Sequence, residues 1–565
     1  MKVKDIPYVR ISLSELQQEL EAIAAGIRTA ADADSILSLR ERMLRLLARY
    51  QSASTLCNIR HNANTADPFY LREHEYYDEI DPEVQNLFAA CRGALLRSPF
   101  RDELEIRLSP LYFRWMEVQA KTISPLILDD MIEENRLCSE YSLLMSGLEI
   151  VFRGKRYTVS ELYHFLDHDN RAVRREAYIA YGTHLNTIAS QLDDIFDRLV
   201  KVRHRMAQKI GYENFVPLGY ARVDRISYGK DEVGIFRRNV LDSIVPVVSR
   251  LRREAAGEIG VNSIMVYDNG ILLSGGDPKP LGGENDILRT AREMYHEMSA
   301  ETGRFIDMML GNEAFDLDVR KNKWSGGCCA YIPSCKQPFI FANFNGTADD
   351  VEVMTHEAGH ALNACLIADN RFALEIGSGG AETAETQATA MEFFAWRYTE
   401  KFFGKDAARY QFAHALDIFS RIPFAAAADA FQQAVYEDPE MSPQQRNALW
   451  AQMEAEYRPY LSNDGIPFFE DGRRWQLQMH IYELPFYFID YALAQTAALW
   501  FLMESQKNYQ DAFDRYLTLM KHGGEVYFED LLKEARIPSP FREGSLQAIA
   551  AELEALLHRI RQTIS

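Results

Sequence analysis

Two kinds of residue are scarce in this sequence, and both shortages exclude classes of protein. Cysteine occurs only seven times in 565 residues, an odd number without paired CxxC motifs. Neither a disulfide framework nor a cysteine zinc site is therefore indicated, and a reducing compartment fits best. Positive charge is also scarce, because 62 Lys and Arg residues face 82 Asp and Glu residues and leave a net charge of −20. Since nucleic acid binds basic surfaces, we expect no nucleic-acid partner.

Long apolar stretches are missing as well. The longest run, around residues 491–503, is too short to span a membrane and contains Gln495 and Thr496. The first residues carry charges but no apolar segment follows them, so no secretion signal is indicated. We therefore expect a cytoplasmic protein with no membrane contact.

The composition that remains is that of a globular protein rich in helices. Hydrophobic residues make up 47% and charged residues 25% of the chain, which are ordinary proportions. Apolar residues at helical spacing recur over residues 13–50, 82–96, 126–148, 159–205, 381–403, 410–436, 474–505 and 544–564. Frequent Gly and Pro and short apolar strings between residues 261 and 344 predict a small sheet. We predict a mostly α protein packed as one body, with a helical N-terminal lobe over residues 1–200 and a second region over residues 201–565.

The segment His356-Glu357-Ala358-Gly359-His360 has the spacing of a metal site on a helix. Two histidines four residues apart project from one face of an α-helix and can share one ion. A zinc ion held by two histidines and a carboxylate keeps a position for water, lowers the pKa of that water to roughly 7, and needs a nearby carboxylate to take the proton. We predict that His356 and His360 bind zinc and that Glu357 is the catalytic base. The alternative is a helix with two incidental histidines.

A third ligand has to come from another segment, and the predicted helix over residues 381–392 is the best source. It follows a glycine-rich turn at residues 377–380, which can bring it back alongside the first helix. Glu382, Glu385 and Glu392 lie on roughly one face of it. A face with three carboxylates needs a cation if it is buried, whereas a solvated acidic face does not. Periodicity alone does not choose among the three glutamates.

These motifs together resemble a known family. Glu385 follows His360 by 25 residues and Glu392 follows Glu385 by seven, and further similar segments are residues 330–333, 338–347 and 480–491. The sequence resembles the thimet oligopeptidase and oligoendopeptidase F zinc metallopeptidases, in particular their Pz-peptidase-like bacterial branch. The resemblance implies a two-lobed helical zincin-type fold with a small β-sheet beside a deep substrate channel. It also implies that Glu385 is the third zinc ligand and that Glu392 orients a ligand histidine.

The resemblance further assigns hydrogen-bond donors for the oxyanion that forms during peptide hydrolysis. The matching residues are His480, Tyr491 and, with a departure from the pattern, Tyr487. Close relatives are expected to carry Tyr where this chain has Phe488, so the second donor is missing or replaced by Tyr487 or Tyr482. Aromatic core packing is the alternative role for each of these tyrosines.

The segment Gly326 to Tyr331 predicts an edge strand that can pair with an extended peptide, with glycines that let the peptide backbone come close. Adjacent Cys328 and Cys329 chelate one ion poorly and Cys335 is six or more residues away. We therefore expect these cysteines to be ordinary reduced thiols.

The function expected from these features and the resemblance is that of a zinc-dependent endopeptidase. With one zinc ion per chain and metal-activated water, it would cleave internal bonds of short unstructured peptides, with Glu357 carrying the proton to the leaving amine. One alternative is a metal-dependent carboxypeptidase, which would need a cationic group for a free C-terminus. Another is a non-enzymatic peptide-binding protein that retains the site. Both a monomer and a homodimer remain open.

Overall fold

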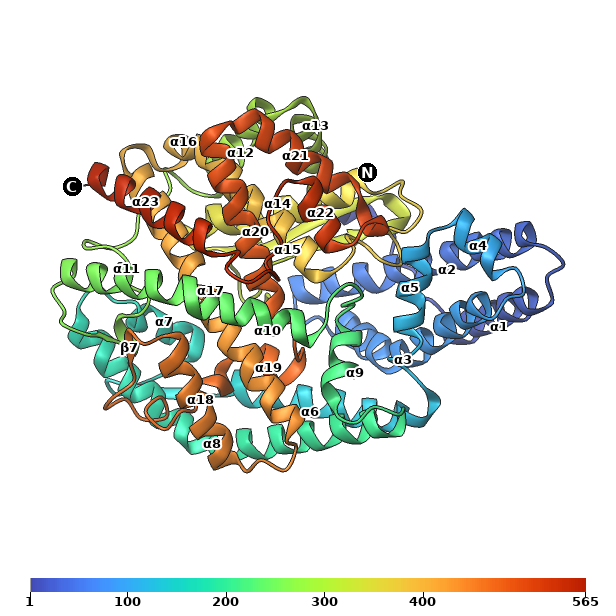
Figure 1. Cartoon of the computed structure of the whole chain (residues 1–565), viewed down its shortest axis with the longest axis horizontal. Helices are drawn as coiled ribbons and strands as arrows, with labels where there is room; N and C mark the ends of the chain where they lie inside the picture. Colours follow the sequence, from blue (N-terminus) through green and yellow to red (C-terminus); the bar gives the residue numbers. More distant parts are fainter. Residues whose placement is uncertain (1, 565) are drawn as a thin grey trace.

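Helices make up most of the computed structural model, which describes residues 2–564 (Figure 1). Within that range the strands form three small sheets with the orders β1-β2, β3-β7 and β4-β6-β5. Among the same residues, no helix combines the length and the apolar character that crossing a membrane requires. The predicted fold class, mostly α with a small sheet, is confirmed.

The first helices form an elongated group, drawn in blue at the right of Figure 1. Asp32 begins α2 by accepting a hydrogen bond from the Ser35 N–H, and Asp67 does the same for α3 ahead of Pro68 in its first turn. The helices of this group are α1 (Leu13–Thr29), α2 (Ala33–Ala63), α3 (Pro68–Leu96), α4 (Arg101–Arg107) and α5 (Pro110–Gln119).

The second group of helices includes a short β-hairpin, which no helical pattern had covered and which packs against α7 (Val159–Leu166) and α8 (Arg171–Lys209). In this hairpin β1 (Glu149–Phe152) pairs antiparallel with β2 (Lys155–Thr158). Its two-residue turn, Arg153-Gly154, has positive φ at both positions (48° and 78°), as a tight hairpin turn requires. The helices of the second group are α6 (Leu128–Ser146), α7 (Val159–Leu166), α8 (Arg171–Lys209), α9 (Phe215–Arg222), α10 (Lys230–Asn239) and α11 (Val245–Glu258).

The predicted sheet forms in the expected region, and its last strand along the chain ends at Phe344, shortly before the helix with the histidine motif begins at Asp349. β6 (Gln337–Phe344) is its central strand, parallel to β4 (Phe315–Asp318) and antiparallel to β5 (Cys328–Ile332). β5 therefore lies at an edge of the sheet. The helices α12 (Glu284–Met298) and α13 (Ala300–Gly311) precede this sheet, and β3 (Ile264–Met265) pairs elsewhere with β7 (Leu461–Ser462).

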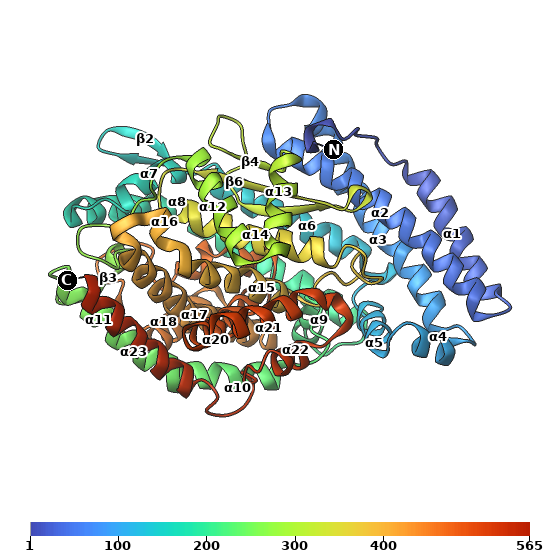
Figure 2. The same ribbon diagram turned by 90° about the horizontal axis from the view of Figure 1, so that it is seen from above.

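The helix that carries the histidine motif, α14 (Asp349–Leu366), packs between the sheet and α15 (Ala381–Phe394). α15 lies near the centre of both ribbon views and contacts α14 and α20 (Phe488–Lys507), between which Figure 2 draws it (Figures 1 and 2). Gly359 allows the close approach of α14 and α15, because a Cβ atom there would lie 2.7 Å from the Ala388 Cα. The remaining helices are α16 (Thr399–Phe403), α17 (Ala407–Glu437), α18 (Pro443–Tyr457), α19 (Met479–Glu483), α20 (Phe488–Lys507), α21 (Tyr509–Lys521), α22 (Phe528–Glu534) and α23 (Gln547–Ile564).

The helix predicted over residues 474–505 is interrupted. After α19 the chain runs through Leu484 and Pro485, and Phe486 has a φ of +70° before α20 begins. Proline disfavours a helical conformation in the residue before it and supplies no N–H of its own. The continuous helix was therefore a wrong prediction, and the break separates His480 from Tyr491 in α20, with Tyr487 at the N-cap of that helix.

Two separate apolar cores are present among the described residues. The smaller one joins side chains of α1 to α5 with Phe372, which belongs to the loop between α14 and α15. Glu375 of the same loop accepts hydrogen bonds from Arg40 and from the Tyr112 hydroxyl, the latter at 2.9 Å. The loop between the helices of the predicted metal site thus packs with the first helices. The predicted boundary at residue 200 falls inside α8, whose buried side chains belong to the larger core, and the division into two domains stays a prediction.

Candidate active site

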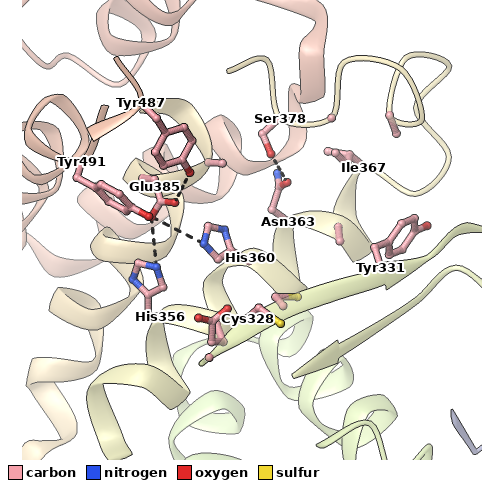
Figure 3. Close-up of a pocket in the computed structure, with 17 residues that line it drawn as sticks. Cys328, Tyr331, His356, His360, Asn363, Ile367, Ser378, Glu385, Tyr487 and Tyr491 are labelled. Carbon is pink, nitrogen blue, oxygen red and sulfur yellow. Dashed lines mark hydrogen bonds and ion pairs between the residues drawn. The ribbon is translucent and has the colours of Figure 1, made fainter. Parts of the chain in front are cut away.

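A cavity of about 480 Å³ lies where α14, α15, α20 and the edge strand β5 meet (Figure 3). Both motif histidines, Glu357 and Glu385 line it from the two central helices. Tyr487 and Tyr491 line it from the opposite side, and β5 contributes Cys328, Cys329 and Tyr331. The residues predicted from three distant segments of the sequence therefore surround one cavity.

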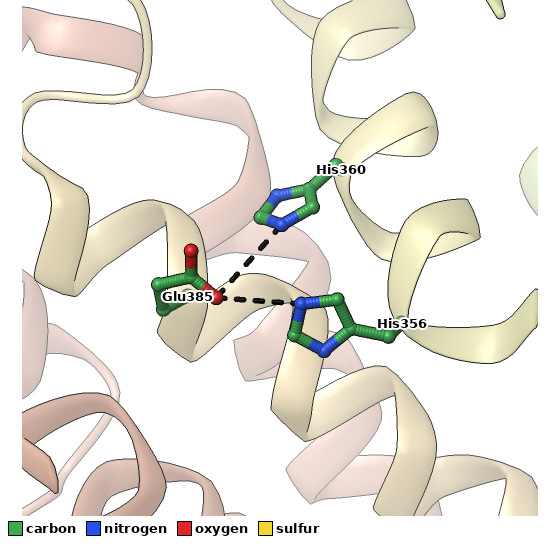
Figure 4. Close-up of side chains that lie close together, drawn as sticks. All are labelled: His356, His360 and Glu385. Carbon is green, nitrogen blue, oxygen red and sulfur yellow. Dashed lines mark ion pairs between the residues drawn. The ribbon is translucent and has the colours of Figure 1, made fainter. Parts of the chain in front are cut away.

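The three predicted metal ligands converge within this cavity (Figure 4). The nitrogen and oxygen atoms that they offer all lie within 4.8 Å of one another. Glu385 Oε2 is 3.3 Å from His356 Nε2 and 3.9 Å from His360 Nε2. His356 and His360 project together because they are one turn apart on α14, and α15 brings Glu385 opposite them.

The chemistry of these atoms fits a divalent cation. Glu385 Oε2 is buried and makes no hydrogen bond, although two imidazole nitrogens face it. Burial opposes a charge on His356, but Glu385 and Glu392 outweigh it and raise the pKa of His356 well above its usual value. The carboxylates thus attract one positive charge to this point. Two imidazole nitrogens and a carboxylate oxygen are common ligand atoms for a divalent metal. A bound metal would take the place of the proton at this point.

Glu392 lies behind the first ligand, as the resemblance implied. Its Oε1 accepts a hydrogen bond from His356 Nδ1 at 2.7 Å, and its Oε2 accepts one from His414 Nε2 at 2.7 Å. Burial disfavours the carboxylate, yet these two hydrogen bonds prevail and lower the pKa of Glu392 to about 2. With Nδ1 engaged in this way, His356 turns Nε2 toward the cavity.

Glu357 lies beside the ligands at the cavity wall, with 8% of its surface exposed. Burial is the main cause that raises the pKa of its carboxyl to about 7, and the charges of Glu385 and Glu392 act in the same direction. A carboxyl group in such a place can take up and release a proton near neutral pH.

The aromatic side of the cavity is formed by Tyr487 and Tyr491. The Tyr487 hydroxyl donates a hydrogen bond to Glu385 Oε1 at 3.1 Å. Tyr491 lies edge-on to Tyr487, with ring centres 5.4 Å apart. The His480 ring stacks on Tyr487 at 12° between ring planes and is not among the side chains that line the cavity. Burial lowers the pKa of His480, which favours its neutral form.

Comparison with known proteins agrees with this geometry. A family model described as "Peptidase M3 N-terminal domain" matches residues 3–123, and one described as "Peptidase family M3" matches residues 283–551. A solved structure of Pz peptidase A with an inhibitor is 37% identical, covers 100% of both chains and has a TM-score of 0.93. The chain belongs to peptidase family M3.

Further relatives of this M3 chain carry related names. A solved structure assigned as an oligoendopeptidase F from Bacillus anthracis is 36% identical over 100% of this chain and 99% of its own, with a TM-score of 0.89. Oligopeptidase PepF from Bacillus subtilis is 21% identical over 443 residues, 72% of this chain and 61% of PepF. The match thus spans about three fifths of that curated relative. The resemblance to the oligoendopeptidase F family is confirmed.

Tyr482, named as a possible replacement for the second donor of the M3 site, and Phe488, at the position where that donor is missing, do not line the cavity. Tyr482 is fully buried, stacks on Tyr141, and donates its hydroxyl proton to the Leu192 carbonyl at 3.3 Å. Phe488 packs edge-on against Phe424. Of the tyrosines considered as a replacement, Tyr487 is the one with its hydroxyl at the metal ligands.

The cysteines of this M3 chain are free thiols throughout the described residues. Cys328 and Cys329 line the cavity, whereas Cys335 is exposed on the turn after β5. Burial, with a smaller contribution from Glu357, raises the pKa of Cys328 to about 11. A thiol with such a pKa is protonated at neutral pH and is a poor nucleophile.

Sequence reasoning missed two residues that bind neighbours of the M3 site residues. His414 of α17 binds Glu392, and the buried Arg225 binds Asp490 and the Phe486 carbonyl next to the tyrosines. Neither belongs to a motif with a fixed spacing. Arg225 lies in a loop beside Asp224, so no local pattern signalled it, whereas an isolated histidine in an apolar part of α17 was an available signal for His414.

Proposed function

We propose that this M3 chain is a zinc-dependent endopeptidase that hydrolyses internal bonds of short, unstructured peptides. The observation that carries the proposal is the convergence of His356, His360 and Glu385 on one point of the cavity, with the Glu357 carboxylate beside them. Two histidines and a glutamate are a common donor set for catalytic zinc, which keeps a further position open. The oligopeptidase and oligoendopeptidase names of the relatives point the same way.

An extended peptide fits the edge strand β5. β5 pairs with β6 on one side, and no other strand of the described residues pairs with it, so a peptide strand could add to this edge. Gly327, Cys328 and Cys329 bring this strand to the cavity that holds the metal ligands. A peptide bound along β5 would therefore lie with its backbone beside Glu357 and the ligands.

Zinc held by His356, His360 and Glu385 would supply a Lewis acid that polarises the scissile carbonyl and activates a water molecule. A carboxylate oxygen of Glu357 accepts a proton from the attacking water and passes it to the nitrogen of the leaving amine. Both transfers use the same carboxylate, which lies next to the ligands in sequence and in space.

The side of the cavity formed by Tyr487 and Tyr491, the tyrosine side, stabilises the negative charge that develops on the carbonyl oxygen. Tyr491 lines the cavity, and its hydroxyl donates a hydrogen bond to that oxygen. His480, which does not line the cavity, contacts Tyr487 and Tyr491 through its ring. Tyr487, whose hydroxyl is bound to Glu385, holds this ligand in place. In this assignment Tyr491 takes the donor role and Tyr487 a positioning role.

The carboxypeptidase alternative is less well supported. An enzyme that removes C-terminal residues needs a cation to hold the free carboxylate, and none of the described residues that line the cavity is lysine or arginine. A non-enzymatic role is opposed by Glu357, which a peptide-binding protein would not need. We also propose a cytoplasmic location and no nucleic-acid or membrane partner, for a monomer or a homodimer.

A Glu357→Gln variant tests the function. Because glutamine cannot accept the proton, we expect zinc to stay bound at one ion per chain and cleavage to fall by about 10²–10⁴-fold. Mass spectrometry of products from a peptide pool, with both termini blocked and with both termini free, separates internal from terminal cleavage. A chelator-treated sample of the wild type is the control, and normal turnover by the variant would contradict the mechanism.

A further inference from the structure

A line of hydrogen bonds runs from the first metal ligand into the protein interior. It passes from His356 to Glu392 and from Glu392 to His414, each at 2.7 Å, and from His414 Nδ1 to Trp396 Nε1 at 2.9 Å. Trp396 lies in the turn that follows α15, and His414 lies in α17. The helices α14, α15 and α17 and the turn after α15 thus contribute to one linear network.

The chemistry of the last member fixes the direction of every bond in this line. The indole nitrogen of Trp396 can only donate, so His414 Nδ1 must accept. The proton of a neutral His414 ring then lies on Nε2, which donates to Glu392. Glu392 accepts on both oxygens, and His356 donates from Nδ1. His356 Nε2, which faces Glu385, is left as the nitrogen that can bind a metal.

A doubly protonated His414 would break this order. Burial lowers the pKa of His414, and the carboxylates of Glu352 and Glu392 raise it by more than burial lowers it. A second proton on Nδ1 would nevertheless point at the indole N–H, where two donors would face each other at 2.9 Å. We therefore take the ring as neutral, because the position of Trp396 provides no acceptor.

The line is shielded from water. His414 is 2% exposed, Trp396 is 4% exposed and Glu392 is 7% exposed. Tyr410 stacks on the His414 ring at 10° between planes, and Phe393 packs on it with ring centres 5.1 Å apart. Hydrogen bonds in such surroundings have no competing solvent, so the proton positions are well defined.

We propose that His414, oriented by Trp396, is a positioning residue for the metal site, which fixes the proton on His356 Nδ1 through Glu392 and thereby strengthens metal binding. The proposal rests on the proposed function only in assuming a divalent metal on His356. Substitution of residues that hydrogen-bond to a metal ligand typically weakens metal binding by about 10–100-fold. His414 does not touch the metal position itself, since it is not one of the converging ligands.

Two substitutions of His414 test the proposal on the full-length chain. His414→Phe keeps an aromatic ring but removes both hydrogen bonds, and His414→Gln keeps an N–H group that reaches Glu392. We expect the zinc dissociation constant, measured by competition with a chromophoric chelator, to rise about 10-fold or more in the first variant. In the second variant it should stay within about threefold of the wild type.

The difference in melting temperature between zinc-loaded and zinc-free protein gives a readout that a purely structural role would not change. His414→Phe should lower the melting temperature of the zinc-free form. It should also reduce the difference, because zinc stabilises the folded protein less when it binds more weakly. A zinc affinity within twofold of the wild type in His414→Phe would overturn the proposal. An equal loss in His414→Gln would do so too.

Trp396→Phe tests the outer end of the line. It should weaken zinc binding by about two- to fivefold, and the double variant with His414→Phe should bind zinc no more weakly than His414→Phe alone, because the two residues act in series. Trp450→Phe is the matched control, since Trp450 is fully buried and its indole N–H has no partner in the structure. Additive losses in the double variant would contradict the series.

These measurements need no substrate, so the two proposals can fail separately. If the enzyme is active and substitution of His414 leaves its zinc affinity unchanged, the positioning role alone is refuted. A chain that binds zinc through the line but cleaves no peptide would refute the proposed function alone.

Discussion

On the metal side of the cavity, hydrogen bonds between side chains fix the position of a ligand, because His356 is bound to Glu392 and Glu392 to His414. On the tyrosine side, Tyr487, Tyr491 and His480 touch mainly through their rings. Their placement depends on the backbone, where Arg225 binds the Phe486 carbonyl and Asp490. The metal side is therefore fixed by hydrogen bonds between side chains, and the tyrosine side by the buried Arg225, which binds the segment that carries the tyrosines. Damage to the first half should appear in metal affinity, and damage to the second in turnover, except at Tyr487, whose hydroxyl is bound to the ligand Glu385.

The largest expected effect is on the metal side. His360→Ala removes one of three converging ligands, so we expect the purified protein to hold far less than one zinc per chain and to show no detectable cleavage. Metal analysis by mass spectrometry together with a fluorogenic peptide assay checks both. Full zinc occupancy in this variant would show that the ion binds elsewhere.

The next effect concerns the anchor of the tyrosine side. Arg225 and Asp490 are both fully buried and are joined at 2.7 Å. Arg225→Met leaves Asp490 without its cation, so the free energy of unfolding should fall by about 3–5 kcal/mol. We expect kcat to fall as well, with an unchanged zinc dissociation constant, measured by denaturant titration, kinetics and chelator competition.

Arg174→Met is the matched control for that variant. Arg174 is 4% exposed and pairs with the buried Asp268 at 3.0 Å, in contact with neither tyrosine. It should lose stability but retain the kcat of the wild type. If both arginine variants change kcat equally, Arg225 has no special relation to the tyrosine side.

The smallest effects separate the two tyrosines. Tyr491→Phe should lower kcat by about 10²–10³-fold with zinc affinity intact, as the loss of one oxyanion donor does. Tyr487→Phe should instead weaken zinc binding by about tenfold, because its hydroxyl is bound to Glu385. Kinetics on zinc-saturated enzyme and chelator competition distinguish these outcomes. The opposite pattern would exchange the two roles.

The metal side could be predicted largely from the sequence, for physical reasons. A spacing of four residues on one helix determines the relative position of His356 and His360 whatever the rest of the fold. Glu385 could not be separated from Glu382 and Glu392 by periodicity, and the family resemblance was needed to choose it. In the structure all three are buried, and Glu382 lies near Asp490 and Arg225, away from the ligands.

The tyrosine side and the supporting residues could be predicted less well. His414 and Arg225 meet partners that only tertiary packing brings near, and no local pattern encodes such contacts. The break in the predicted helix over residues 474–505 was signalled by Pro485, but the apolar spacing on both sides outweighed it. Similarly, Arg153-Gly154 was a turn signal within a segment that was assigned no structure.

Phe372 and Glu375 have a consequence for any attempt to dissect this chain. They lie between the two helices that bear the ligands, yet their packing partners come from the first helices, where Glu375 meets Arg40 and Tyr112. A fragment that begins after α5 would expose a phenylalanine ring and leave a carboxylate without its donors at that connection. We therefore expect such a fragment to melt at a lower temperature than the whole chain, because the connection between the two ligand helices would lose its packing partners.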